Sequence, residues 1–131
     1  MIIEQLSVFI ENRSGRLSEV TRVLAEAGVN LRAFSMAETT EFGILRLIVS
    51  DVDLAVKTLS EAGFAARLTD VVKVSCGDEP GTLSNVLEYL SGQGIFIEYM
   101  YAFAHQESVA NVVIKPNDIA ACLKALESYN K

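Results

Sequence analysis

The chain contains an internal repeat, and this repeat limits the possible folds more than any other feature of its 131 residues. Seven identical pairs align at a shift of 66 residues: Val8 with Val74, Gly15 with Gly81, Leu17 with Leu83, Ser18 with Ser84, Val20 with Val86, Leu24 with Leu90 and Gly28 with Gly94. Beyond position 50 the shift becomes 67, because the second copy has one extra residue near its central hairpin. Repetition at a fixed period indicates that each copy is one structural unit. The sequence therefore predicts two domains, residues 1–69 and residues 70–131.

The first copy alternates between strand and helix patterns. Apolar residues alternate with others at 5–10, as in a half-buried strand, and recur at helical spacing over 17–27. Gly28 suits the end of that helix, and Asn12 and Ser14 are candidates for its N-cap. The remaining pattern predicts strands at 30–38 and 43–49, a helix at 52–62 capped by Ser50-Asp51, and a strand at 64–68.

The order of these elements predicts the fold class. Strand, helix, strand, strand, helix, strand is the split βαββαβ arrangement. Each predicted strand has only one strongly apolar side, so both helices must cover the same face of the sheet. We expect an α+β, ferredoxin-like fold that is repeated twice, with antiparallel sheets and with helices on one face.

The second copy follows the same order but is shorter. Its pattern predicts strands at 72–76, 95–103 and 109–115 and helices at 83–90 and 119–126. No clear fourth strand remains before Lys131, so we expect the sheet of the second domain to be one strand short. The open edge would be covered by a neighbouring segment or by a partner chain.

Charge and composition argue against several classes of partner. The net charge is −6 and the 11 Lys and Arg residues are scattered singly, which disfavours binding to a nucleic-acid backbone. No apolar stretch approaches the roughly 18 residues that a membrane helix needs, and no secretory signal pattern opens the sequence. Two widely separated cysteines suit a reduced compartment. We expect a cytoplasmic protein that binds neither nucleic acid nor membrane.

Signs of catalysis are weak in the sequence. His105 is the only histidine and falls in a predicted hairpin loop, where we expect solvent around it. Cys76 and Cys122 fall on predicted core faces, so they suit small buried side chains better than zinc ligands. We therefore expect no metal, no cofactor and no catalytic residue. A small enzyme on a ferredoxin-like scaffold remains an alternative, because a fold alone does not exclude activity.

The loop before the first helix of each copy, together with the repeated βαββαβ order, resembles the ACT domain family. The first copy reads Asn12-Arg13-Ser14-Gly15-Arg16-Leu17 and later Gly28-Val29-Asn30-Leu31. The second copy reads Asp78-Glu79-Pro80-Gly81-Thr82-Leu83 and later Gly94-Ile95-Phe96-Ile97. Phe96 stands where that family often has a polar residue, and Arg13-Ser14 stand where it often has Asp and Pro. The resemblance covers nearly the whole chain, twice.

The resemblance implies a regulatory module that pairs side by side and binds a small effector, often an amino acid. The contacts that it implies are Asn12, Arg13, Ser14, Gly15, Arg16, Leu17 and Asn30 in the first copy and Asp78, Glu79, Pro80, Gly81, Thr82 and Leu83 in the second. We expect a non-catalytic amino-acid sensor that forms a homodimer. One alternative is a regulatory subunit that docks on an enzyme of amino-acid metabolism without a ligand of its own.

Physical chemistry offers two interpretations of the glycine loops. Unpaired backbone N–H groups at a helix start attract a carboxylate, and glycine lets a ligand approach the backbone closely. Asn30 can accept a hydrogen bond from an ammonium group. In the other interpretation Gly15 and Gly81 only permit a tight turn, and Asn12, Ser14 and Asp78 only cap helices.

Overall fold

The computed structural model describes residues 1–11, 13–38, 41–103 and 109–130. These residues form an α+β fold with six strands and four helices, which confirms the predicted fold class. In chain order the elements are β1 (Ile2–Glu11), α1 (Arg16–Glu26), β2 (Leu31–Glu38), β3 (Phe42–Val49), α2 (Val52–Glu61), β4 (Ala65–Gly77), α3 (Thr82–Gly92), β5 (Ile97–Ala102), β6 (Val109–Pro116) and α4 (Ile119–Tyr129).

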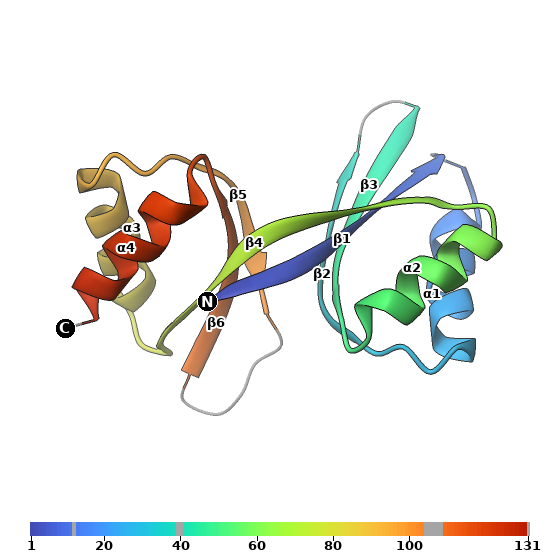
Figure 1. Cartoon of the computed structure of the whole chain (residues 1–131), viewed down its shortest axis with the longest axis horizontal. Helices are drawn as coiled ribbons and strands as arrows, with labels where there is room; N and C mark the ends of the chain where they lie inside the picture. Colours follow the sequence, from blue (N-terminus) through green and yellow to red (C-terminus); the bar gives the residue numbers. More distant parts are fainter. Residues whose placement is uncertain (12, 39–40, 104–108, 131) are drawn as a thin grey trace. The chain divides into compact units, whose positions relative to one another are not determined.

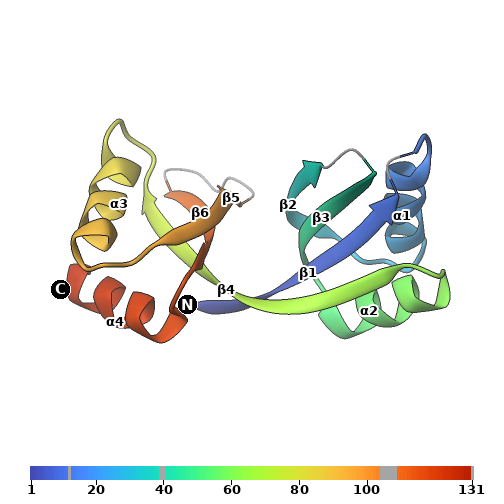
Figure 2. The same cartoon turned by 90° about the horizontal axis from the view of Figure 1, so that it is seen from above.

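The chain divides into two compact units. The first unit comprises residues 4–69, and the second comprises residues 1–3 together with residues 70–131. In the first unit the strand order is β2-β3-β1-β4, and β3 pairs antiparallel with both β1 and β2. Figure 2 shows α1 and α2 together on one side of these strands.

The core of the first unit follows from the alternation along its strands. Leu6, Val8 and Ile10 point to the same face of β1, and each is at most 2% exposed. They pack in one cluster with Leu24 of α1 and Leu59 of α2. Because both helices contribute to this single cluster, both cover the same face of the sheet, as the sequence predicts.

The ends of the helices in the first unit agree only partly with the prediction. Asp51 caps α2 by accepting a hydrogen bond from the backbone N–H of Leu54 at 3.1 Å. Gly28, with a φ of 79°, directly follows the C-cap of α1, as expected. The prediction of Ser14 as the N-cap of α1 is wrong, because Gly15 takes that position. Asn12, the other predicted N-cap, lies outside the described residues.

The second unit repeats the arrangement around its own core. Its strand order is β1-β4-β6-β5, with only residues 1–3 of β1 in this unit. Val72 and Val74 of β4 pack with Leu90 of α3 and Cys122 of α4 in one cluster. The two helices therefore cover one face of this sheet as well, as Figure 1 shows.

Residues 1–3 lie beside β4 in the second unit, where the fourth strand of a βαββαβ sheet belongs. The backbone N–H of Lys73 donates to the carbonyl oxygen of Met1 at 2.9 Å. The sequence does not predict this pairing, because the two residues are 72 positions apart. Of the two alternatives that we expected for this edge, a neighbouring segment or a partner chain, the structure shows a segment of the same chain at Lys73.

The strand β4 is longer than expected. The sequence predicts separate strands at 64–68 and 72–76, but one strand runs without a break from Ala65 to Gly77. Residues 69–71 are Thr, Asp and Val, so neither glycine nor proline interrupts the extended chain there. The same strand therefore serves as the last strand of one repeat and the first strand of the next.

Candidate functional site

The first helix of each unit begins at a glycine that has a left-handed backbone. Gly15 precedes α1 with a φ of 88°, and Gly81 precedes α3 with a φ of 91°. Apart from the glycine and its two chain neighbours, no atom lies within 4 Å of the position that a Cβ would take at either glycine, so the space beside both is open. Because glycine has no side chain, neither of these N-cap residues makes a side-chain hydrogen bond to its helix.

The second helix of each unit begins differently. Asp51 caps α2 and Asp118 caps α4, and in each case the carboxylate accepts from a backbone N–H at 3.1 Å. These carboxylates occupy the position where a helix start attracts negative charge. The N-cap residues of α1 and α3 supply no such carboxylate, so these helix starts can accept an anion from outside the chain.

The loop before α1 places two arginines near this helix start. Arg13 is exposed and forms an ion pair with Glu11 at 3.6 Å. Arg16 is mostly buried: its guanidinium forms an ion pair with Glu19 at 3.0 Å and lies 4.3 Å from the centre of the Phe64 ring. Arg16 therefore packs back onto its own unit, and its buried Nε has no hydrogen-bond partner among the described residues.

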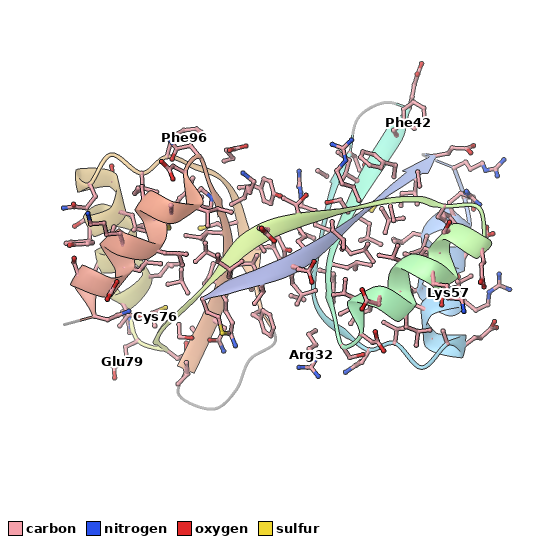
Figure 3. The ribbon with its side chains drawn as sticks, viewed as in Figure 1. Arg32, Phe42, Lys57, Cys76, Glu79 and Phe96 are labelled. Carbon is pink, nitrogen blue, oxygen red and sulfur yellow. The ribbon has the colours of Figure 1, made fainter. Side chains whose placement is uncertain are left out.

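The loop before α3 is held by the side chain of Thr82. The hydroxyl of Thr82 donates to the carbonyl oxygen of Glu79 at 3.0 Å and also to that of Gly77. Glu79 and Pro80 are exposed, and Figure 3 shows Glu79 at the surface. Leu83 packs against the core of the second unit. The two loops therefore share a backbone shape, but Thr82 stands where the first loop has a cation.

Asn30 lies at the opposite end of α1 from Gly15. The 11 residues of α1 separate the two positions by about 16 Å at 1.5 Å per residue. The backbone of Asn30 pairs with Ser50: its N–H donates to the Ser50 hydroxyl at 2.9 Å, and its carbonyl accepts from the Ser50 N–H at 3.0 Å. One unit alone therefore does not bring Asn30 next to the loop that contains Gly15.

Phe96 holds the corresponding position in the second unit. Its backbone pairs in the same way with Asn117, with distances of 3.0 and 2.8 Å. Its side chain is 66% exposed and lies at the surface (Figure 3). The backbone geometry is thus repeated, whereas the polar side chain is not.

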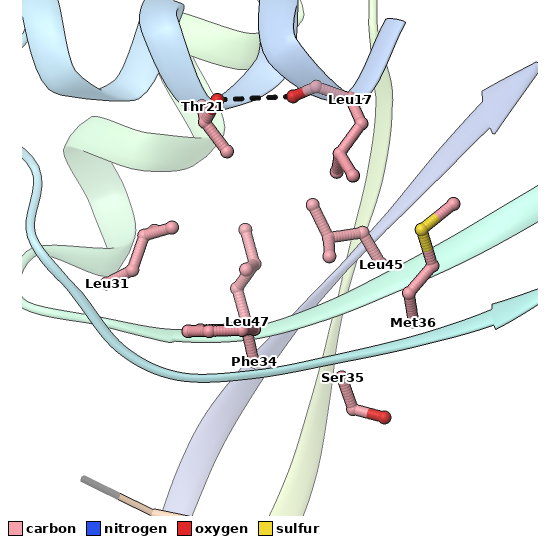
Figure 4. Close-up of a pocket in the computed structure, with 8 residues that line it drawn as sticks. All are labelled: Leu17, Thr21, Leu31, Phe34, Ser35, Met36, Leu45 and Leu47. Carbon is pink, nitrogen blue, oxygen red and sulfur yellow. Dashed lines mark hydrogen bonds between the residues drawn. The ribbon is translucent and has the colours of Figure 1, made fainter. Parts of the chain in front are cut away.

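A groove lies between α1 and the strands β2 and β3 of the first unit (Figure 4). We name it the α1 groove; it encloses about 410 Å³ and is lined by Leu17, Thr21, Leu31, Phe34, Ser35, Met36, Leu45 and Leu47. It extends along α1 from Leu17, in the first helical turn, to Leu31, the residue after Asn30. Of the predicted site residues, only Leu17 lines this groove, whereas Gly15 lines a separate hollow with Ser18, Glu19 and Arg22.

Sequence reasoning predicts only Leu17 among the residues that line this groove. Phe34 and Met36 look like core residues in the sequence, because they alternate along a predicted strand. In the structure Phe34 is 67% exposed and Met36 is 36% exposed. Alternation along a strand predicts which face of the sheet a residue lies on. It does not predict whether a helix covers that part of the face.

The described residues offer little for catalysis. They contain no group of three or more His, Cys, Asp or Glu side chains that could hold a metal ion. Cys122 is buried, and this burial raises the pKa of its thiol, so it is a poor nucleophile. Cys76 is half-buried, and His105 lies outside the described residues. Among the described helices, none is both long enough and apolar enough to cross a membrane.

Comparisons with known proteins agree with this fold. The family model described as an ACT domain pair matches residues 1–121. A crystal structure of a protein from Bacteroides thetaiotaomicron is 52% identical, with a TM-score of 0.94, over 99% of this chain and 90% of that chain. No curated protein matches the sequence.

Two more distant structures share the fold. The regulatory subunit of aspartate kinase from Thermus thermophilus, in a ligand-free form, is 20% identical with a TM-score of 0.69, over 98% of this chain and 96% of that chain. The corresponding subunit from Thermus flavus is also 20% identical, with a TM-score of 0.63, over 100% of this chain and 96% of that chain.

Proposed function

We propose, because this chain belongs to the ACT domain pair family, that it is a non-catalytic regulatory protein that binds a free amino acid and forms a homodimer. Its fold is that of the regulatory subunits of aspartate kinase. We propose amino-acid binding and self-association from two features. One is the geometry of the helix start and groove in the first unit, and the other is the repetition of that helix start in the second unit.

The observation that carries the proposal is the difference between the helix starts. In both units the second helix is capped by an aspartate, whereas the first helix begins after a left-handed glycine without a side-chain cap. The N–H groups of Arg16 and Thr82 donate to loop carbonyls at 3.4 and 3.3 Å, and the glycine at each N-cap has no side chain that could accept from the N–H groups that follow. A bound carboxylate would accept from these groups and complete the helix start.

The helix start does not provide enough binding energy by itself. A carboxylate at an exposed helix start gains about 0.3–1 kcal/mol from the dipole. Micromolar affinity requires about 8 kcal/mol. Several backbone hydrogen bonds and burial of the effector side chain must therefore contribute, and the α1 groove adjoins the helix start through Leu17.

A homodimer would bring the separated parts of the site together. β2 is the end strand of the first unit, so one row of its backbone groups has no partner strand among the described residues. Two copies related by a two-fold axis can pair antiparallel along β2. This pairing would place Asn30 of one copy near the Met36 end of the other copy, and Met36 shares the α1 groove with Leu17.

A thermal melt tests the proposed function. The protein is unfolded and refolded to remove any bound ligand, and its melting temperature is then measured with each common amino acid at millimolar concentration. A ligand at one hundred times its dissociation constant stabilises the protein by about 2.7 kcal/mol, which raises the melting temperature on the order of 8–15 °C for this size. No rise with any amino acid would contradict amino-acid binding.

Two glycine variants locate the site. Gly15→Val places a side chain where the carboxylate is expected, so it should abolish the rise that the first unit provides. Gly28→Val is a matched control: its φ of 79° is also left-handed, and its Cβ position is equally open. Both variants lose stability through backbone strain, and the corresponding Ala variants replace them if either fails to fold. An equal response of both variants to the ligand would argue against the Gly15 site.

A second candidate function is a regulatory subunit that docks on an enzyme of amino-acid metabolism without binding an effector itself. The shared fold with aspartate kinase regulatory subunits favours it. It predicts no thermal shift with any amino acid, and co-purification of one such enzyme, identified by mass spectrometry. A clear thermal shift with one or two amino acids would favour the sensor instead.

A further inference from the structure

The α1 groove has walls that are almost entirely apolar. Six of its eight lining residues are Leu, Phe or Met, and the two others are Thr21 and Ser35. The hydroxyl of Thr21 donates within α1, to the carbonyl oxygens of Ser18 at 2.9 Å and Leu17 at 3.3 Å. Figure 4 shows the Ser35 hydroxyl directed away from the groove. No side chain of this lining therefore offers a polar group to a ligand inside it.

We propose that the effector is an amino acid with a bulky apolar side chain, aliphatic or aromatic, and that this side chain occupies the α1 groove. This inference rests on the proposed function, which supplies the carboxylate contact at the start of α1. Leu17 links the two parts, because it lies in the first turn of α1 and also lines the groove. A ligand whose carboxylate meets the helix start thus has its side chain directed to the apolar walls.

The size of the groove supports a small-molecule occupant. Its volume of about 410 Å³ lies in the range of roughly 300–1,000 Å³ that is typical of ligand pockets. Phe34, at 67% exposed, and Leu17, at 43% exposed, are apolar surface that such a side chain would remove from water. A polar side chain would leave its own hydrogen-bonding groups unpaired there, so it would bind more weakly.

Isosteric amino acids provide the decisive comparison. Isothermal titration of the ligand-free protein would compare leucine with asparagine, methionine with glutamine, and valine with threonine. We expect at least about 10-fold tighter binding of the best apolar member over its polar isostere, because an unpaired amide is costly in an apolar site. Leucine should bind about 60-fold more tightly than alanine, because its side chain has three more carbon atoms and each buried carbon contributes roughly 4-fold.

Matched phenylalanine variants test the location. Phe34→Ser removes one wall of the groove and should weaken binding of the preferred apolar amino acid at least about 5-fold. Phe96→Ser is the control, because Phe96 is 66% exposed and does not line the groove. Both side chains are largely exposed, so both variants should fold, and melting curves without ligand check this.

The possible outcomes separate this inference from the proposed function. Tighter binding of apolar amino acids that is weakened by Phe34→Ser but not by Phe96→Ser supports it. Binding of a polar or charged amino acid in preference to apolar ones overturns it, while the sensor function remains. Binding of no amino acid overturns both. If Phe34→Ser leaves the affinity unchanged but lowers the mass measured by light scattering, a second copy covers Phe34 and the inference is wrong.

Discussion

Asp51 and Gly15 begin the two helices of the first unit in different ways, and this difference is measurable at the scale of one residue. Asp51→Ala removes the acceptor for the Leu54 N–H and should lower the free energy of unfolding by about 1 kcal/mol, within a range of roughly 0.5–2 kcal/mol. Urea denaturation measures this loss. Asp53→Ala removes a charge from the same first turn without removing the cap, so its effect should be smaller. Equal losses would show that charge, and not the hydrogen bond, stabilises the helix start.

The helix caps also show which local features the sequence predicts and which it does not. The sequence predicts Gly28 as the end of α1 and Ser50-Asp51 as the cap region of α2, and both agree with the structure. It predicts Ser14 as a cap, although Gly15 takes the position with a left-handed backbone. The preference of residue types for the N-cap position does not decide between these two residues, because serine and glycine both occur there. The choice depends on the loop geometry between β1 and α1.

Leu24 of α1 and Leu90 of α3 are equivalent in the repeat, and both are fully buried in the clusters that hold the helices on the sheets. At the scale of the element, Leu24→Ala and Leu90→Ala should each destabilise the protein by about 2–5 kcal/mol. Chemical denaturation measures the loss, and hydrogen exchange shows which unit opens. Arg22→Ala, an exposed change on α1, should stay within about 0.5 kcal/mol. A loss of less than 1 kcal/mol for either leucine variant would contradict the assigned cores.

The sequence predicts the individual helices and strands, but it does not predict how consecutive strands connect. Apolar periodicity predicts all four helices, because each has one face against a sheet. It does not predict that β4 continues through residues 69–71, since strand propensity there is compatible with either a break or a continuation. It also does not reveal the α1 groove, because an exposed Phe34 and a buried core residue have the same pattern in the chain.

At the scale of the whole molecule, the pairing of residues 1–3 with β4 makes a direct prediction. Deletion of residues 1–3 removes the carbonyl acceptor of the Lys73 N–H, so the Lys73 amide should exchange with solvent faster. Hydrogen exchange followed by NMR measures this change. The Phe64 amide, which donates to Leu59 in the first unit at 2.9 Å, serves as the control and should keep its protection. Unchanged exchange at Lys73 would show that Met1 does not protect it.

The pairing of Met1 with Lys73 also has a consequence for synthesis on the ribosome. Lys73 follows Met1 by 72 residues, which at roughly 5–20 residues per second takes about 4–14 s. Residues 4–69, which make up the first unit, have all been synthesised by then. The segment Met1-Ile2-Ile3 must remain accessible during this delay, because its hydrogen-bonding partner does not yet exist. The second unit therefore closes on residues that were made before all of its other parts. A chaperone that holds residues 1–3 would delay that unit while leaving the first one free to fold.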